Sequence, residues 1–117
     1  MALFRRHRAA GTSSDRARFR EDMAHLEQFA QTRRGVEAYI EPRTTVTETT
    51  VMLVAHDGEW TRRRVPDPYT ARQLGSRLRI PVYDVHLVGY PQRMREYNER
   101  RKRGAGSSLG GEALDQG

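Results

Sequence analysis

The chain has 117 residues, which is enough for one globular domain with a single core. Hydrophobic residues make up 36% of it and charged residues 31%, so that core must be small. The sequence contains no cysteine, which excludes disulfide bonds, thiol catalysis and zinc sites built on thiolates. This composition fits a reducing compartment, and we expect a cytoplasmic protein.

A helix is predicted to follow a disordered, basic segment at residues 1–13. Ser14 can cap it, because a serine hydroxyl accepts a hydrogen bond from a free backbone N–H at a helix start. Gly35 is predicted to end it, because glycine readily adopts the left-handed conformation found there. Between them, apolar side chains recur at steps of three and four residues along one helix face; these are Phe19, Met23, Leu26 and Phe29.

Three antiparallel strands are predicted next, at residues 36–41, 51–55 and 59–65. Polar and apolar residues alternate in the first strand, which Pro42 ends because proline cannot donate to a strand ladder. The second strand is apolar on both faces and is therefore placed centrally in the sheet. Residues 44–50 are β-branched but mostly polar, and they fit either a loop or the frayed start of the second strand.

Asp57 and Gly58 predict a two-residue type I′ hairpin between the second and third strands, since both turn positions need positive φ. In that register Trp60 shares a sheet face with Val51 and Leu53. The facing pairs are then Ala55 with Trp60, Leu53 with Arg62 and Val51 with Arg64.

A second helix is predicted to start at Asp67, a typical N-cap, with Pro68 at its first position. Pro81 stops it. Residues 82–88 fit either a short fourth strand or an ordered crossing segment. A polar, basic helix then runs over residues 91–103, where only Met94 and Tyr97 could anchor it.

The expected fold is a single α+β domain at residues 14–103, followed by a flexible tail at 104–117 that is rich in glycine and serine. Its architecture is two-layered, with a small three-stranded antiparallel sheet and helices on one face. The basic helix at 91–103 belongs to the domain. No segment approaches the roughly 18 apolar residues of a membrane span, and no secretory signal is expected, so we expect no membrane partner.

The net charge of +6 is concentrated towards the two ends of the chain. Residues 1–34 hold eight arginines and four acidic residues, and residues 91–103 hold six basic and two acidic residues. Residues 35–90 are neutral, with seven of each sign. Basic flanks favour an anionic partner such as nucleic acid. The alternative is that the arginine content, 20 of the 21 basic residues, reflects only the coding bias of a GC-rich genome.

Three consecutive arginines follow the single tryptophan in the third predicted strand, so Trp60, Arg62, Arg63 and Arg64 are candidate binding residues. Side chains alternate along a strand, which puts Arg62 and Arg64 on the Trp60 face and Arg63 on the other. Aromatic and arginine side chains on an open sheet face can stack bases and hold phosphates. The alternative is that Trp60 belongs to the core, with the guanidiniums paired to acidic residues; the nearest candidates are Glu37, Glu41 and Glu48.

Five arginines of the last predicted helix complete the candidate interface. A basic helix is typical of an arm that contacts nucleic acid, a ribonucleoprotein or an acidic protein. It is equally typical of a solvated terminal helix, because positive side chains are favourable near a helix C-terminus. The five are Arg93, Arg95, Arg100, Arg101 and Arg103.

Catalytic motifs are not found in the sequence. There is no glycine-rich turn of the nucleotide-binding type and no serine nucleophile elbow. His56 and Glu59 should face each other at the hairpin and could form an acid–base pair or half of a metal site, but a hairpin tip is exposed. We therefore expect no catalytic residue, no metal and no cofactor.

Several motifs carry a resemblance to a known family: Gly35 to Ala38, Glu41 to Thr44, Val54 to Arg64, Ile80 to Asp84 and Pro91 to Met94. In these motifs the chain resembles a family of small actinobacterial proteins without an established function. Such proteins often carry an automatic oxidoreductase label, but the residues here supply no cofactor fingerprint and no redox cysteine.

The sequence favours a non-catalytic binding module that contacts nucleic acid or a nucleoprotein assembly through its arginine-rich flanks. A small regulatory domain that binds another protein, such as an acidic one, is the alternative. An enzyme with an unrecognised site is the third interpretation. Whether DNA or RNA would be bound stays open.

Overall fold

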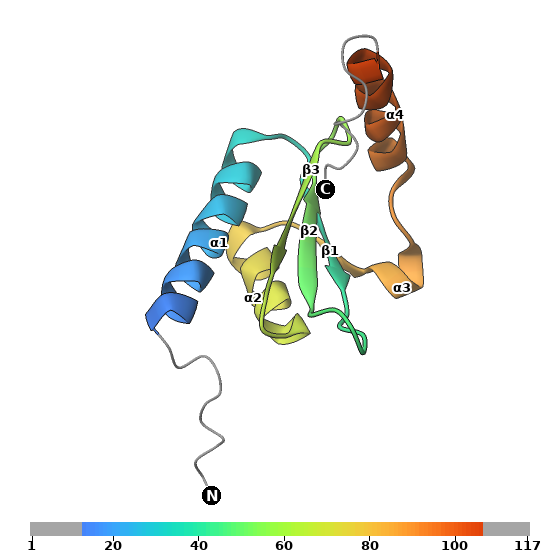
Figure 1. Cartoon of the computed structure of the whole chain (residues 1–117). Coiled ribbons are helices and arrows are strands. Elements are labelled where there is room, and N and C mark those ends of the chain that lie inside the picture. The colour runs from blue at the N-terminus through green and yellow to red at the C-terminus, as the bar shows by residue number, and fades with distance from the viewer. Residues whose placement is uncertain (1–12, 107–117) are drawn as a thin grey trace, which may run out of the picture.

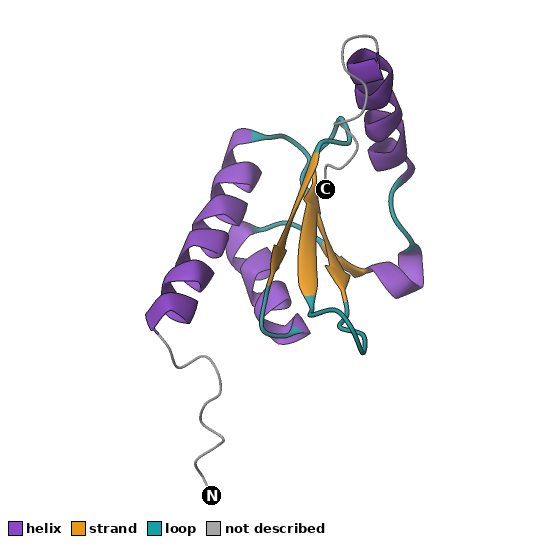
Figure 2. Cartoon of the chain, in the orientation of Figure 1, coloured by secondary structure: helices purple, strands orange, loops and turns teal. Residues whose placement is uncertain are grey.

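The computed structural model describes residues 13–106, and within them a four-stranded sheet has helices on both faces (Figures 1 and 2). The expectations for residues 1–12 and 107–117 lie outside the described residues. The elements in chain order are α1 (Ser13–Thr32), β1 (Glu37–Glu41), β2 (Thr50–Val54), β3 (Trp60–Arg64), α2 (Pro68–Leu78), β4 (Val82–Asp84), α3 (Val85–Val88) and α4 (Gln92–Gly106).

The sheet has the strand order β3-β2-β1-β4. The three predicted strands form the antiparallel part, and β4 adds to β1 in parallel, so the sheet is mixed. The α+β class is therefore confirmed, and residues 82–84 are a strand rather than only a crossing segment. The prediction of helices on one face is wrong, because α1 and α2 cover one face while α3 and α4 lie on the other (Figure 1).

The larger core lies between the sheet and the two helices α1 and α2. Leu26 and Phe29 of α1 are buried, as their helical spacing predicts, and Leu74 of α2 is buried with them. Their partners on β2 are Val51 and Leu53, which are fully buried. Burying apolar side chains of this size contributes about 1.5–3 kcal/mol each, so this layer dominates the stability of the fold.

A second, smaller core lies on the opposite face of the sheet and needs its own helical cover. Tyr39, Met52 and Val54 project from the opposite face of the sheet and are buried. Met94 of α4 covers them, which makes it the anchor that the sequence predicts. Because β2 is apolar on both faces, the sheet needs cover on both sides.

Arg93 fastens α4 to the sheet through polar contacts. Its Nε donates to the carbonyl of Ala55 at 2.9 Å, and its Nη2 donates to the carbonyl of Val54 at 3.3 Å. The same Nη2 pairs with the carboxylate of Glu37 at 2.9 Å. One arginine therefore donates hydrogen bonds to two backbone carbonyls and one carboxylate, and these contacts hold α4 against the sheet.

The β2–β3 hairpin differs from its prediction by one residue. Its loop has three residues, since the amide of Ala55 donates to Glu59 O at 2.8 Å and the amide of Gly58 donates to Ala55 O at 2.9 Å. Among the loop residues only Gly58 has a positive φ, +95°, so a type I′ turn is excluded. Trp60 therefore faces Val54, and the arginine pairs shift to Arg62 with Met52 and Arg64 with Thr50.

This shift matters because a one-residue slip moves every side chain to the other sheet face. Trp60 consequently lies on the Met52 and Val54 face, under α4, rather than on the face of Val51 and Leu53.

The observed start of α2 matches its predicted start, whereas the start of α1 and the end of α4 differ from their predictions. Asp67 caps α2 by accepting from the amide of Thr70 at 2.8 Å, with Pro68 as the first helical residue. Ser14 lies inside α1, which begins one residue earlier at Ser13. Helix α4 continues to Gly106, so residues 104–106, predicted to belong to the tail, are helical.

Candidate nucleic-acid interface

Trp60 lies at the edge of the second core and is half-buried. Its indole N–H donates to Asn98 Oδ1 of α4 at 2.9 Å. The guanidinium of Arg62 lies over its ring, 5.2 Å from the centroid. One ring edge and one ring face are thus already in contact with the protein, and only part of the ring faces solvent.

Arg62 is held by the carboxylate of Glu41 in a bidentate pair, with contacts of 2.8 and 2.9 Å. Thr50 and Tyr90 donate to the same carboxylate at 2.6 and 2.5 Å. Burial raises the pKa of Glu41, but these hydrogen bonds outweigh burial, and the pKa lies below its ordinary value. For Arg62, pairing with Glu41 agrees with the alternative that the sequence left open.

Arg63 points to the opposite face, as the alternation along the strand predicts. It pairs with Asp22 of α1 at 3.3 Å and donates to the carbonyl of Arg62 at 2.8 Å. Arg64 is exposed at the end of β3. The three consecutive arginines thus have three different environments, and of the three only the Arg64 side chain has no hydrogen-bond or ion-pair partner among residues 13–106.

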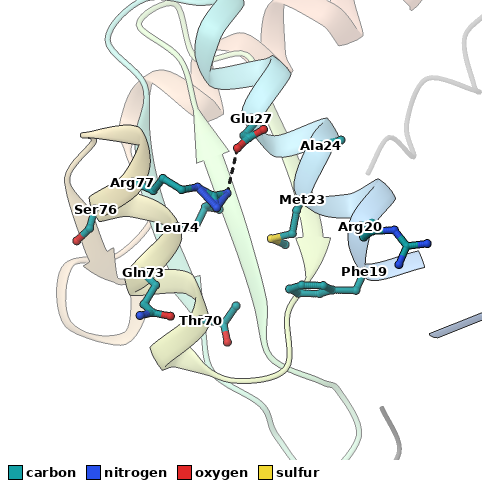
Figure 3. A pocket seen from close by; sticks show the side chains of 10 residues that line it. All are labelled: Phe19, Arg20, Met23, Ala24, Glu27, Thr70, Gln73, Leu74, Ser76 and Arg77. Atoms are coloured by element: carbon teal, nitrogen blue, oxygen red, sulfur yellow. Dashed lines mark ion pairs between the residues drawn. The ribbon is translucent and has the colours of Figure 1, made fainter. Parts of the chain in front are cut away.

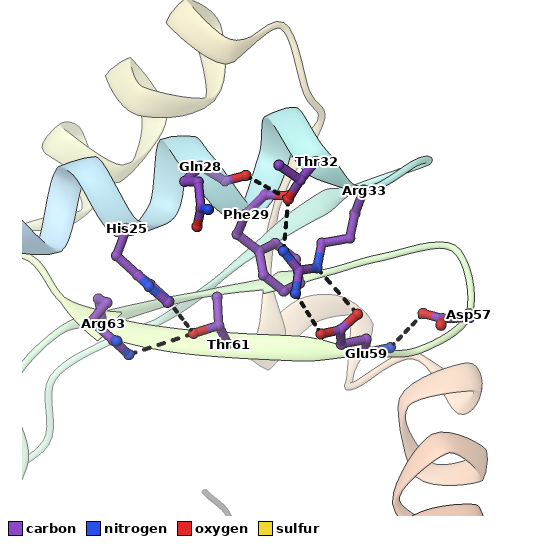
Figure 4. A network of polar contacts seen from close by, with 9 residues as sticks. All are labelled: His25, Gln28, Phe29, Thr32, Arg33, Asp57, Glu59, Thr61 and Arg63. Carbon is purple, nitrogen blue, oxygen red and sulfur yellow. Dashed lines mark hydrogen bonds and ion pairs between the residues drawn. The ribbon is translucent and has the colours of Figure 1, made fainter.

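A polar network joins α1 to β3 on the Arg63 side (Figure 4). His25 lies 2.7 Å from the hydroxyl of Thr61, with Arg63 beside them. Burial lowers the pKa of His25 below 6.5; Arg63 and Arg33 act in the same direction, and Asp22 opposes them. The folded protein therefore favours the neutral imidazole.

The protein is expected to lose stability as the pH falls through 6.5 towards the lower pKa of folded His25. The unfolded chain binds the proton more readily in that window, so protonation favours unfolding. Denaturant midpoints measured between about pH 8 and pH 5 test this. That pH window lies above the range in which most carboxylates titrate. His25→Gln should flatten the profile, whereas replacing the exposed His86 should not; equal slopes in all three proteins would contradict the role of His25.

The proposed pairing of His56 with Glu59 is wrong. Glu59 forms a bidentate pair with Arg33, with contacts of 3.2 and 2.7 Å (Figure 4). Its backbone carbonyl accepts from Ala55, not from His56. His56 is exposed at the tip, and the carboxylate of Asp57 accepts from the amide of Glu59 at 2.9 Å. The hairpin therefore brings together no acid–base pair.

The remaining cations of α4 are exposed. Arg95 donates to the carbonyl of Tyr90 at 3.3 Å, and Arg100 donates to the carbonyl of Asp57 at 2.8 Å. Arg100 and Arg101 each lie 5.8 Å from the ring centroid of Tyr97. For Arg103 the contact is a loose one to Glu99, at 3.9 Å one helical turn earlier.

Residues 100–103 are four consecutive basic residues, so their side chains project around most of the helix circumference. The hairpin tip lies against the preceding turns of α4, as the Arg100 contact with Asp57 shows, and α4 extends past that tip (Figure 1). The backbone of the exposed Arg34 lies beside the hairpin tip, because the amide of His56 donates to its carbonyl at 2.8 Å. We call Arg34, Arg100, Arg101, Lys102 and Arg103 the hairpin-end basic surface.

Sequence reasoning named three of these five residues as sites and missed Lys102 and Arg34; the backbone of Arg34 comes beside the hairpin tip only in the folded protein. It also missed a groove between α1 and α2 with a volume of about 900 Å³ (Figure 3). Phe19, Met23 and Leu74 line the groove, and an Arg77–Glu27 ion pair of 3.0 Å spans it.

No family model, no curated protein and no solved structure matches this chain. Among residues 13–106, no group of three or more histidine or acidic side chains is placed to hold a metal ion. No helix in the described part is long and apolar enough to cross a membrane.

Proposed function

We propose that this protein binds the phosphate backbone of nucleic acid, alone or in a nucleoprotein assembly, through the hairpin-end basic surface. The observation that carries the proposal is the run Arg100 to Arg103 on the part of α4 that extends past the hairpin. A basic helix can lie along a phosphate backbone, and forked guanidinium donors match phosphate oxygens.

The local charge balance supports this surface. The surface contains five cations, and the acidic residues beside them are Glu96 and Glu99 of α4 and Asp57 of the hairpin tip. The carboxylate of Asp57 accepts a hydrogen bond from the amide of Glu59. The contact of Glu99 with Arg103 is loose, at 3.9 Å. An exposed pair of that kind contributes little, about 0–1 kcal/mol, so a phosphate can displace it.

The bonding of the other candidate residues argues for the helix end rather than the sheet face. Arg62, Arg63 and Arg93 each have carboxylate partners, and Trp60 is half-covered by α4. Recruiting them for nucleic acid would mean breaking contacts that hold the fold together. Contacts between the end of α4 and the phosphate backbone of a nucleic acid do not distinguish one base sequence from another. We therefore expect binding with little sequence preference.

Binding to another protein is the second candidate, and the α1–α2 groove favours it. Phe19 in that groove is 38% exposed, which is unusual for a phenylalanine on an otherwise core-facing helix face. The two candidates differ in salt dependence, because contacts in an apolar groove are not weakened by salt as phosphate contacts are.

A salt titration of duplex binding tests the proposal. Three to four phosphate contacts give a slope of log affinity against log salt of about −3 to −4. The variant R101Q/K102Q/R103Q should lower the steepness of that slope by about 3 and weaken binding at low salt by about tenfold. The control R20Q/R43Q/R72Q removes the same charge from exposed arginines elsewhere and should keep most of the slope.

A slope near zero for the natural protein would contradict the proposal. Equal losses in the two triple variants would also contradict it, because binding would then follow the net charge and not the hairpin-end basic surface.

A further inference from the structure

A hollow of about 660 Å³ lies beside α3, on the sheet face that carries Arg62, and no residue of α4 lines it. Its floor is formed where β1 and β3 end and β2 begins, and its walls are the loop at residues 42–49 and the segment from α3 to Tyr90. The volume lies within the range of about 300–1,000 Å³ typical of small-molecule sites.

Two guanidinium groups and three hydroxyl groups line this hollow. Arg62 gives its Nε and Nη2 to Glu41, whereas the guanidinium of Arg64 has no partner among the described residues. The hydroxyl of Thr50 donates to Glu41 at 2.6 Å, and those of Thr44 and Thr47 bond each other at 2.8 Å, which leaves one hydroxyl hydrogen of that pair free.

Glu41 keeps the first guanidinium in place for a ligand. The pair is bidentate, and Thr50 and Tyr90 donate to the same carboxylate, so the arginine is fixed before a ligand arrives. Such fixing lowers the entropic cost of binding. The charge of Glu41 is balanced by Arg62, which leaves Arg64 and the exposed Glu48 as the other charged side chains of the lining.

We propose that this hollow binds a phosphomonoester group, held by the free guanidinium of Arg64, by the side of the Arg62 guanidinium that Glu41 does not use, and by the one hydroxyl that the Thr44–Thr47 bond leaves free to donate. A phosphoryl group offers three oxygens and up to two negative charges, which matches two guanidiniums. A carboxylate offers two oxygens and one charge, which a single arginine satisfies. The proposal is independent of the hairpin-end basic surface, because none of that surface's residues lines the hollow.

The test uses the full chain, with phenyl phosphate, benzoate and phenol as matched probes in an NMR titration. Phenyl phosphate should shift the amides of residues 44–50 and 85–90, and the other two probes should not at the same concentration. R64Q should weaken binding by about tenfold, since a charge-assisted hydrogen bond is lost. E48Q should strengthen binding, because it removes a repelling charge, and R43Q, on the same loop but outside the lining, should change nothing.

Equal binding of benzoate and phenyl phosphate would overturn the proposal, and so would a loss in R43Q as large as in R64Q. Arg64 and Glu48 are exposed, so both variants should keep the natural melting temperature. Two sources of the group are then separated with a trinucleotide carrying a 5′-phosphate or a 5′-hydroxyl. Tighter binding of the phosphorylated trinucleotide than of phenyl phosphate indicates a nucleic-acid end, and the reverse order indicates a free phosphorylated metabolite.

Discussion

Gly58→Ala is expected to lower the stability of the protein by about 2–5 kcal/mol, a shift of melting temperature on the order of 10–20 °C. Gly58 has φ +95°, where an L side chain is strained by about 1–2 kcal/mol. A Cβ there would also lie 2.1 Å from the carbonyl oxygen of Arg93 and 2.8 Å from Cβ of Tyr97. Relieving that overlap means moving α4, and overpacking of this kind costs about 1–3 kcal/mol more.

Gly89→Ala separates the two contributions. Gly89 also has a positive φ, +77°, but a Cβ there would meet nothing within 4 Å. With ψ at 176° Gly89 is in a region that only glycine adopts readily, so this control should lose about 1–3 kcal/mol from backbone strain alone. Equal losses in the two variants, measured by thermal unfolding, would contradict the close packing of the hairpin tip against α4. Fluorescence of Trp60, the single tryptophan, reports the same contact, since its indole N–H is bonded to Asn98 of α4.

Arg93→Ala is expected to cost about 2 kcal/mol, because hydrogen bonds to charged groups contribute about 1.5–3 kcal/mol. The change removes the donors of Val54 O and Ala55 O and the ionic partner of Glu37. The Arg93 side chain is only 29% exposed, so water replaces these contacts incompletely.

Arg95→Ala is the matched control for that prediction. Arg95 lies on the same helix, is exposed, and donates only to the carbonyl of Tyr90 at 3.3 Å. Its replacement should change the free energy of unfolding by less than about 0.5 kcal/mol. If chemical denaturation finds the two variants equally stable, Arg93 does not anchor α4.

Local signals predicted the elements that depend on local chemistry. Asp67 and Pro68 marked the start of α2, and the spacing of Leu26 and Phe29 identified the buried face of α1. The apolar run of β2 predicted a strand inside the sheet, and β2 does lie between β3 and β1. Each of these follows from side-chain periodicity or capping within a few residues, which a sequence displays directly.

The errors arose where distant residues decide the outcome. Asp57 and Gly58 fit both a two-residue and a three-residue hairpin, and the choice depends on contacts with α4, which lies far along the chain. Helix α4 was not placed on the second sheet face, because its anchoring depends on Arg93 as much as on Met94. Arginines that reach backbone carbonyls leave no hydrophobic pattern in a sequence.

The candidate interface was predicted in part. Arg100, Arg101 and Arg103 form a visible run of charge, but the sequence did not show that Arg62, Arg63 and Arg93 have carboxylate partners. Whether an arginine is free or paired depends on tertiary contacts, and these divide the predicted residues into structural and exposed ones. The hollow near Arg64 was not predicted, because its walls come from three separate segments.

The central claim is that nucleic acid binds at the hairpin-end basic surface, and amide chemical-shift mapping with a short duplex tests it most directly. The largest shifts are expected at residues 56–58 and 98–106 and at Arg34, and they should weaken as salt is raised. Shifts centred instead on Trp60 and Arg62, or no shifts at low salt, would contradict the claim.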